Sequence, residues 1–188
     1  MISLNSFGID SFLQKKEMKI ILVGYMGSGK SAVGMCLAKS LGMNFLDLDA
    51  YIEKELNTTI SEIFKSKGEL YFRRKEHEYL QQVLRQDESL VVGTGGGTPC
   101  YSGNMKLLAD TTPYVFYLKV SISGLLSRLQ KEKEQRPLIS DISDEDLPEF
   151  IGKHLFERNP FYTMAHHTIV CDDKTISEIS EEIEGLLA

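Results

Sequence analysis

The stretch GYMGSGKS, residues 24–31, carries the strongest structural signal in the chain. It matches the pattern GxxxxGK[ST] and lies between an apolar run and a segment of helical periodicity. Its glycines let the backbone amides turn toward phosphate oxygens, and the dipole of the following helix favours the same anion. Lys30 would reach the outer phosphates, and the Ser31 hydroxyl would hold Mg²⁺. A simple glycine-rich turn is the alternative, but placement after a strand favours binding of ATP or GTP.

Strand-like and helix-like segments alternate on both sides of this motif. MKIILV, residues 18–23, is a short continuous apolar run, as expected for a strand buried on both faces. The alternation predicts a three-layer α/β/α fold with a five-stranded parallel sheet, whose ligands lie at the carboxyl ends of the strands. We predict strands at 18–23, 44–49, 89–93, 113–120 and 166–171, and helices at 30–41, 50–86 with breaks near 57–59 and 67–68, 102–110, from 122–130, about 144–157, and 175–187.

The composition is that of a single soluble globular domain. Of 188 residues, 42% are hydrophobic and 26% are charged, and the net charge of -6 argues against a bulk nucleic-acid binder. No apolar run reaches the roughly 18 residues of a membrane span. Cys36, Cys100 and Cys171 are odd in number and have no CxxC spacing, so we expect free thiols and a cytoplasmic protein.

Two segments flank or interrupt the predicted domain of residues 18–188. Residues 1–17 lack the basic start and apolar region of a signal peptide, and we interpret them as a flexible extension, vector-derived or from an alternative start. A docked helix is the alternative, since its apolar side chains (Phe7, Ile9, Phe12 and Leu13) could pack. The charged segment at about 130–143 is expected to be a mobile lid.

The pair Asp47 and Asp49 lies in the second predicted strand, 44–49. Residues two apart on a strand face the same way, so both carboxylates would project beside the phosphate loop. One could hold Mg²⁺ through water, and the other could accept a hydrogen bond from an attacking hydroxyl. The alternative is helix capping, because Asp49 precedes a helix. The neighbouring phosphate loop favours the functional interpretation.

Arginines and glycines supply the remaining signals. Arg73 and Arg74 lie in the amphipathic segment 68–76, and Arg158 in RNPFY (158–162) is expected at a helix end. Two guanidinium groups facing one pocket would clamp an anion, although ion pairs with Glu69, Glu76 or Glu78 are the simpler explanation for either Arg73 or Arg74. GTGGGTP, residues 93–99, follows a strand and suggests close approach of backbone to a ligand. Arg136, in QRPL, could fold over bound ATP.

Together these motifs resemble shikimate kinase, a family of the nucleoside monophosphate kinase group of phosphate-loop folds. The resemblance covers residues 18–187, with IILVGYMGSGKS, FLDLD, TISEIFKSKGELYFRRKE, GTGGGT, RPL and RNPFY in the family's order. It implies a phosphate-loop kinase fold with a mobile lid and transfer of a phosphoryl group from ATP to the 3-hydroxyl of shikimate, a step of aromatic amino-acid biosynthesis. The cofactor implied is Mg²⁺, and we expect a monomer.

The resemblance also implies roles for individual residues. Asp49 would bind the shikimate hydroxyls and accept the proton, and Asp47 would lie near Mg²⁺ with Ser31. Arg73, oriented by Glu76, and Arg158 would hold the shikimate carboxylate. The remaining matches are the glycine cradle (Gly95, Gly96, Gly97), the apolar wall (Phe64, Phe72), the phosphate-loop residues (Gly27, Ser28, Gly29, Lys30, Ser31, Ala32), the lid arginine (Arg136), and two candidates beside the adenine (Arg128, Lys174).

Departures and alternatives remain. After the tyrosine of RNPFY, the family often has an acidic residue and then alanine, whereas this chain has TMAHH, with Met164 and His166. His166 and His167 could suggest a metal pair, but we expect ordinary packing or surface exposure. A related kinase acting on gluconate or a nucleoside monophosphate is one alternative function. A nucleotide-binding switch module is another, although there is no NKxD motif and such a module needs no carboxylate clamp.

Overall fold

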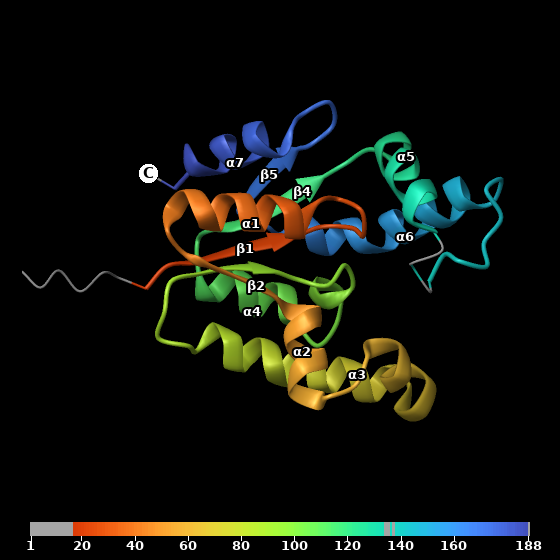
Figure 1. Cartoon of the computed structure of the whole chain (residues 1–188), viewed down its shortest axis with the longest axis horizontal. Coiled ribbons are helices and arrows are strands. Elements are labelled where there is room, and N and C mark those ends of the chain that lie inside the picture. The colour runs from red at the N-terminus through yellow and green to blue at the C-terminus, as the bar shows by residue number, and fades with distance from the viewer. Residues whose placement is uncertain (1–16, 134–135, 137, 188) are drawn as a thin grey trace, which may run out of the picture.

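The computed structural model of the protein describes residues 17–133, 136 and 138–187, and Figure 1 shows its arrangement. The strands are β1 (Lys19–Val23), β2 (Asn44–Asp47), β3 (Leu90–Gly93), β4 (Val115–Lys119) and β5 (His167–Val170). The helices are α1 (Lys30–Leu41), α2 (Leu48–Leu56), α3 (Ile60–Leu84), the short 3-10 helix η1 (Thr98–Cys100), α4 (Asn104–Thr111), α5 (Ile122–Glu132), α6 (Leu147–Tyr162) and α7 (Ile176–Glu184).

All five strands form one parallel sheet in the order β2-β3-β1-β4-β5. β1 lies in the middle, and all five of its residues are buried, as the apolar run MKIILV predicts. Ile21 pairs with Val92 of β3 on one side and with Val115 of β4 on the other. The predicted five-stranded parallel α/β fold is confirmed.

Helices cover both faces of the sheet. Figure 1 shows α1 and α7 side by side on one face, with α4 and α6 on the other. α2 and α3 pack on each other and extend beyond the β2 edge of the sheet. The phosphate loop, the turn after β3 and the start of α2 all follow the carboxyl ends of neighbouring strands, so the fold gathers them at one edge.

The second strand ends earlier than predicted. β2 ends at Asp47 and α2 begins at Leu48, so Asp49 lies in the first turn of a helix and not on a strand. The reason is that the Asp47 carboxylate accepts hydrogen bonds from the backbone N–H groups of Asp49 and Ala50 and caps the helix. The expectation that both carboxylates project from one strand face was therefore wrong, and Asp47, not Asp49, is the cap.

The helix that carries Arg158 is displaced from its predicted range of about 144–157. α6 begins at Leu147 and continues through Pro160 to Tyr162, so Arg158 does not lie at its end. Proline lacks a backbone N–H and usually interrupts a helix. Here the helical bonding resumes beyond the proline, because Thr163 donates both its backbone N–H and its hydroxyl to the Asn159 carbonyl.

The predicted interruptions between residues 50 and 86 are present. Asn57 has a left-handed backbone, with φ 49°, and ends α2. Thr59 and Glu62 form a reciprocal capping box that starts α3. Gly68, with φ 79° and ψ 171°, makes a kink inside α3, because the glycine adopts a backbone conformation that L residues avoid.

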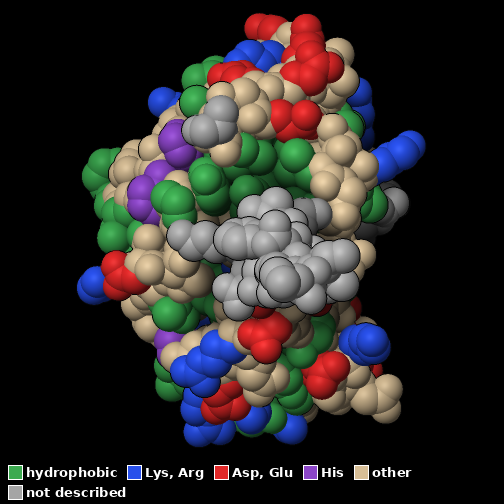
Figure 2. Space-filling model, turned by 90° about the vertical axis from the view of Figure 1, so that its left-hand side faces the viewer, with side chains coloured by type: hydrophobic (Ala, Val, Ile, Leu, Met, Phe, Trp, Pro, Cys, Tyr) green, Lys and Arg blue, Asp and Glu red, His purple; other side chains and the backbone are tan. Residues whose placement is uncertain are grey.

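Some predictions fall partly outside the described residues. Residues 1–16, with the apolar side chains of the possible docked helix (Phe7, Ile9, Phe12 and Leu13), and residues 134, 135 and 137 of the lid segment are not described. Within the described ranges, no helix is long and apolar enough to cross a membrane. Figure 2 shows the face at the amino-terminal ends of the strands, where acidic side chains gather at the top, over α7.

Candidate active site

A cavity of about 490 Å³ lies at the carboxyl ends of the strands. It extends from the phosphate loop to the turn that follows β3, and it contains the start of α2 and the end of α5. Its lining residues are Met26, Gly27, Ser28, Gly29, Lys30, Ser31, Ala32, Val33, Asp47, Asp49, Thr94, Gly95, Gly96, Arg128, Glu132, Arg136, Lys174, Ile176 and Ile179.

The phosphate loop owes its shape to glycine. Gly29 has φ 94° and lies immediately before α1, a conformation that L side chains rarely adopt. A Cβ on Gly24 would lie 2.8 Å from the Leu118 carbonyl oxygen of β4, so the loop packs directly on the neighbouring strand. The curled shape of the loop therefore depends on Gly24 and Gly29, where a side chain would strain the backbone or clash.

Lys30 folds back over this loop. Its Nζ donates to the carbonyl oxygens of Gly24 at 2.8 Å and Tyr25 at 2.9 Å. Burial lowers the pKa of Lys30 to about 8, although the carboxylates of Asp49 and Asp47 oppose the change. A bound phosphate would add negative charge and favour the ammonium form again.

Ser31 and Asp47 form the candidate Mg²⁺ site. The Ser31 hydroxyl donates to Asp47 Oδ2 at 2.8 Å, so two oxygens that could hold a metal lie side by side in the cavity lining. Mg²⁺ prefers oxygen ligands and usually keeps several waters while it bridges substrate phosphates, so this small donor set fits it. Among the described residues there is no group of three or more His, Cys, Asp or Glu side chains that could hold a metal ion.

Asp49 lines the cavity from the first turn of α2. Burial raises the pKa of its carboxyl to about 6, and the negative charges of Glu76 and Asp47 contribute in the same direction. Lys30 and Arg73 act oppositely and lower it. A carboxyl group with a pKa near 6 is suited to accept a proton at neutral pH.

The three glycines after β3 each touch a different part of the site. A Cβ on Gly95 would lie 2.7 Å from Asp49 Oδ1, and one on Gly97 would lie 2.7 Å from Arg73 Nη2. A Cβ on Gly96 would meet the backbone nitrogen of Met26 at 3.2 Å and Arg158 Nη1 at 3.7 Å. The turn therefore joins the carboxylate, both candidate arginines and the phosphate loop, because no side chain separates them.

Arg73 is held on several sides. Its Nη1 donates to Glu76 Oε2 at 2.9 Å and its Nε to Glu69 Oε1 at 3.3 Å. The Tyr101 ring lies 4.0 Å from its guanidinium carbon, a cation–π contact. The predicted contact with Glu76 is present, whereas Arg74 is exposed and only loosely paired with Glu78.

Arg158 approaches the glycine turn from α6. Its guanidinium carbon lies 5.4 Å from the centre of the Tyr25 ring, which belongs to the phosphate loop. Tyr162, one helical turn further on, donates its hydroxyl to the Gly96 carbonyl at 2.5 Å and fixes α6 against the turn. Neither Arg73 nor Arg158 lines the 490 Å³ cavity itself. Arg73 instead lines a second, neighbouring cavity of about 340 Å³.

The predicted aromatic pair lies on α3. The rings of Phe64 and Phe72 are 4.9 Å apart, with Phe72 buried and Phe64 half-buried. Phe72 also lies 5.1 Å from the Arg73 guanidinium. The pair therefore forms an apolar surface beside Arg73, although neither ring lines the main cavity.

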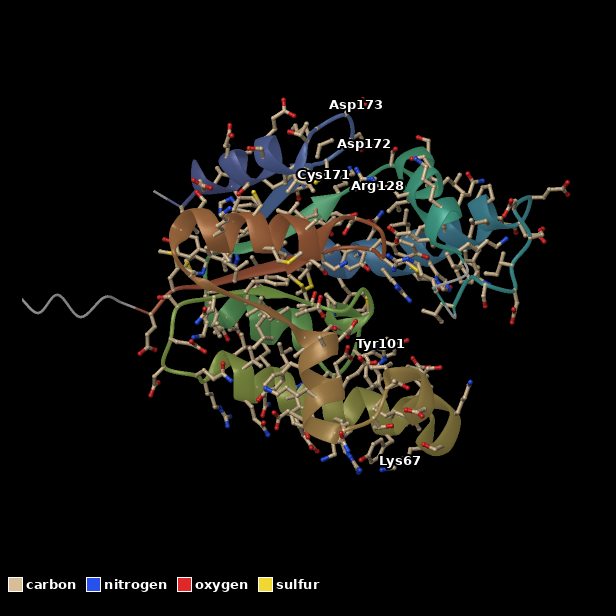
Figure 3. All side chains as sticks on the ribbon, in the orientation of Figure 1. Lys67, Tyr101, Arg128, Cys171, Asp172 and Asp173 are labelled. Atoms are coloured by element: carbon tan, nitrogen blue, oxygen red, sulfur yellow. The ribbon has the colours of Figure 1, made fainter. Side chains whose placement is uncertain are left out.

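The candidate nucleotide residues outside the loop are paired within the protein. Arg136 Nε donates to Glu132 at 3.1 Å at the end of α5. Arg128 donates to the carbonyl oxygens of Gly27 at 3.2 Å and Cys171 at 3.3 Å, and Figure 3 shows Arg128 and Cys171 close together beside the β5 end. Lys174 forms an ion pair with Glu182. All three line the cavity.

The departures after RNPFY lie on the surface. Met164 and His166 are both exposed, and exposure was among the expectations for His166. His167 stacks on Phe116, with ring centres 4.9 Å apart. Among the described residues, His166 and His167 belong to no group of three or more possible metal ligands.

Sequence reasoning assigned no role to four residues of the site. Tyr25, Thr98 and Tyr162 lie inside quoted motifs but had no charge to mark them. Tyr101 follows η1 and covers Arg73, and Figure 3 shows it between the sheet and the α2–α3 pair. No sequence signal pointed to it, because the contact joins two distant parts of the chain.

Comparisons with known proteins agree on one family. A family model described as shikimate kinase matches residues 26–187. A shikimate kinase of Flavobacterium psychrophilum is 44% identical over 169 residues, which are 90% of this chain and 98% of that protein. A shikimate kinase of Flavobacterium johnsoniae is 46% identical over 170 residues, or 90% and 99% of the two chains.

Solved structures give the same result. The crystal structure of shikimate kinase from Bacteroides thetaiotaomicron superposes with a TM-score of 0.85 at 36% identity, covering 90% of this chain and 98% of that one. Shikimate kinase from Acinetobacter baumannii in complex with shikimate has a TM-score of 0.81 at 34% identity, covering 92% and 93%. A gluconokinase from Sinorhizobium meliloti, at 18% identity and a TM-score of 0.54, shares the fold alone. With its phosphate loop, glycine turn and flanking arginines in place, this chain belongs to the shikimate kinase family.

Proposed function

We propose that this protein transfers the γ-phosphate of ATP to the 3-hydroxyl of shikimate and releases 3-phosphoshikimate and ADP. The observation that supports this most directly is the glycine turn, which packs against Asp49, Arg73 and Arg158 within reach of the phosphate loop. Shikimate has one carboxylate and several hydroxyls. Two arginines at one end and a carboxylate at the other match those groups.

Positioning of the acceptor is the first task of these residues. Arg73 and Arg158 approach the glycine turn from two different helices, α3 and α6, so they can hold one carboxylate from two sides. Asp49 lies between the glycine turn and the phosphate loop and would receive the acceptor hydroxyl. Holding the hydroxyl near the γ-phosphate turns a bimolecular encounter into an oriented, in-line transfer.

Proton transfer and charge stabilisation follow. Asp49 accepts the proton of the 3-hydroxyl as the oxygen attacks, which a carboxylate with a pKa of about 6 can do at neutral pH. Lys30 and the phosphate-loop amides stabilise the charge on the transferred group. Arg136 exchanges its contact with Glu132 for the ATP phosphates when the nucleotide binds. Ser31, and Asp47 through water, would hold Mg²⁺, which would supply charge neutralisation for the outer phosphates.

The test is ADP release from Mg-ATP with and without shikimate. We expect shikimate to raise the rate by several orders of magnitude, while gluconate and nucleoside monophosphates leave it at the basal level. Faster release with gluconate or a nucleoside monophosphate would favour the related-kinase alternative. Slow release that no acceptor changes would favour the nucleotide switch.

We infer a monomer that acts without nucleic acid or membrane, in a cytoplasmic setting. The three cysteines are free, which suits a reducing compartment. Light scattering after gel filtration would test the monomer, since a dimer would double the 21.2 kDa mass.

A further inference from the structure

A row of buried polar side chains runs behind Arg73 and joins three elements. Thr98 in η1 donates its hydroxyl to Glu76 Oε1 at 2.6 Å, while Glu76 Oε2 accepts from Arg73 Nη1 at 2.9 Å. Asn104, the first residue of α4, donates from Nδ2 to the Thr98 carbonyl at 2.9 Å. Thr98 and Asn104 are fully buried, and the Glu76 residue is only 1% exposed.

The row continues through His77 and Gln81 of α3. His77 Nδ1 lies 2.6 Å from Asn104 Oδ1, and Gln81 Nε2 lies 2.9 Å from His77 Nε2. Since the Asn104 amide nitrogen donates to Thr98, its oxygen must accept, which assigns the proton of His77 to Nδ1. Nε2 then accepts from Gln81. One assignment therefore satisfies every contact in the row.

The row controls where the Arg73 guanidinium points. A carboxylate rotates easily about its last torsion, so a single contact with Arg73 would leave Glu76 free to turn. Thr98 occupies the other Glu76 oxygen and stops that rotation. Arg73 also has a competing partner in Glu69, whose side chain is 50% exposed. If Glu76 turned away, Arg73 could follow Glu69 and leave the glycine turn.

We propose that Thr98 and Asn104 are positioning residues for Arg73, which they act on through Glu76. Thr98 fixes the Glu76 carboxylate, and Asn104 fixes the turn that carries Thr98. The consequence is an anion site that is already ordered before the acceptor arrives, which lowers the cost of binding it. This inference rests on the proposed function, in which Arg73 binds the shikimate carboxylate.

The test is Thr98→Val, which keeps the shape of the side chain and removes its hydroxyl. We expect the KM for shikimate to rise about tenfold, with kcat and the KM for ATP within about twofold, because one buried hydrogen bond is lost and only the acceptor site depends on it. Thr98→Ser restores the hydroxyl and should restore the KM. If Thr98→Val does not fold, Asn104→Leu carries the same expectation, since it removes the support of the Thr98 turn.

A matched control and a double variant separate positioning from general stability. Thr112 is also buried, donates its hydroxyl to the Lys19 carbonyl at 2.8 Å and accepts from the Tyr114 backbone N–H, but it lies at the amino-terminal end of β1, away from the site. Thr112→Val should lower the thermal midpoint without changing the KM for shikimate. In an Arg73→Ala background, Thr98→Val should add nothing further to the KM.

Two results would overturn the inference. An unchanged KM for shikimate in folded Thr98→Val, or an equal rise with and without Arg73, would show that the row only stabilises the fold. Either result would leave the proposed function intact. Shikimate-independent ADP release by the unaltered chain would instead remove the proposed function, and the positioning role with it.

Discussion

The two halves of the site are built in different ways. The nucleotide side is built around one continuous stretch, Gly24 to Ala32, whose shape comes from glycine backbones and from Lys30 bonded to carbonyls five and six residues before it. Arg128, Arg136 and Lys174 complete its lining. The acceptor side is assembled from four separate segments, with Asp49, Arg73, Gly95–Gly97 and Arg158 each on a different element.

Because of this difference, substitutions can change nucleotide binding and acceptor binding independently. The phosphate loop is shaped mainly by the local bonds of Lys30, with a further bond to the Gly27 carbonyl from Arg128 of α5. The acceptor side depends on how α2, α3 and α6 pack around the glycine turn, so its affinity should respond to changes that never touch the ligand. A substitution in one half should therefore leave the ligand affinity of the other half nearly unchanged.

The largest effect is expected from Lys30→Ala. Turnover should fall at least about a thousandfold, because the ammonium group that stabilises the outer phosphates is gone. Shikimate binding, measured by calorimetry without nucleotide, should stay within a few-fold. Lys39→Ala, an exposed lysine in the last turn of the same helix, is the control and should be fully active. Comparable activity in Lys30→Ala would remove Lys30 from the mechanism.

Asp49→Asn should lower kcat by about 10² to 10⁴-fold. The amide can still accept a hydrogen bond from the acceptor hydroxyl but cannot take its proton. Binding of Mg-ATP should change little, since the phosphate loop does not rely on Asp49 for its shape. Asp110→Asn, at an exposed surface pair with Lys106, is the control. An active Asp49→Asn variant would mean that the proton leaves by another route.

Arg73→Ala and Arg158→Ala should each raise the KM for shikimate by about 10- to 100-fold, with a smaller effect on kcat. Each variant removes one charged partner of the acceptor carboxylate. Arg74→Ala, the exposed neighbour, should leave the KM unchanged. Initial rates over a range of shikimate at saturating Mg-ATP measure this. If the KM for ATP rose equally, the claim that the nucleotide and acceptor halves of the site can be changed independently would be wrong.

The smallest expected effect is on the pH dependence of kcat/KM for shikimate, which reports the ionisation of Asp49. The pKa of Asp49 is raised from its ordinary range to about 6, so the protonated, inactive form accumulates as the pH falls through 6. We expect kcat/KM for shikimate to fall about tenfold per pH unit below that point, since this parameter reports the free enzyme. Glu76→Gln removes a negative neighbour and should move the break to lower pH. A break near pH 4 in the unaltered chain would contradict the buried, charge-crowded setting of Asp49.

Sequence reasoning succeeded where contacts are local. The phosphate loop, the buried strand before it and the breaks in the α2–α3 region depend on glycine, apolar runs and caps that are visible in a few neighbouring residues. The predicted end of the second strand was two residues too late. The Asp47 side chain caps α2 by accepting from the backbone N–H groups of Asp49 and Ala50, and these N–H groups are then not available to a strand.

Site residues that are fixed by tertiary contacts could not be predicted from the sequence. Local pattern alone treats Arg73 and Arg74 alike, since both have glutamates at helical spacing. Packing distinguishes them: the Arg73 side chain is 14% exposed and the Arg74 side chain 67%. Thr98 and Tyr101 reach Glu76 and Arg73 across more than twenty residues, so no periodicity could reveal them.

The glycine turn also restricts how the protein can evolve. A side chain at Gly95 would push on Asp49, and one at Gly97 would push on Arg73, so codons two positions apart affect different kinetic parameters. Gly152 and Gly185, whose nearest neighbours lie 3.6 Å from an added Cβ, can vary without that penalty. Substitutions in this turn therefore shift Asp49 or Arg73 before they make room for a bulkier acceptor. Variants that take a bulkier acceptor would have to begin on α3, where the exposed Leu70 and the second cavity beside Arg73 leave room for substitution.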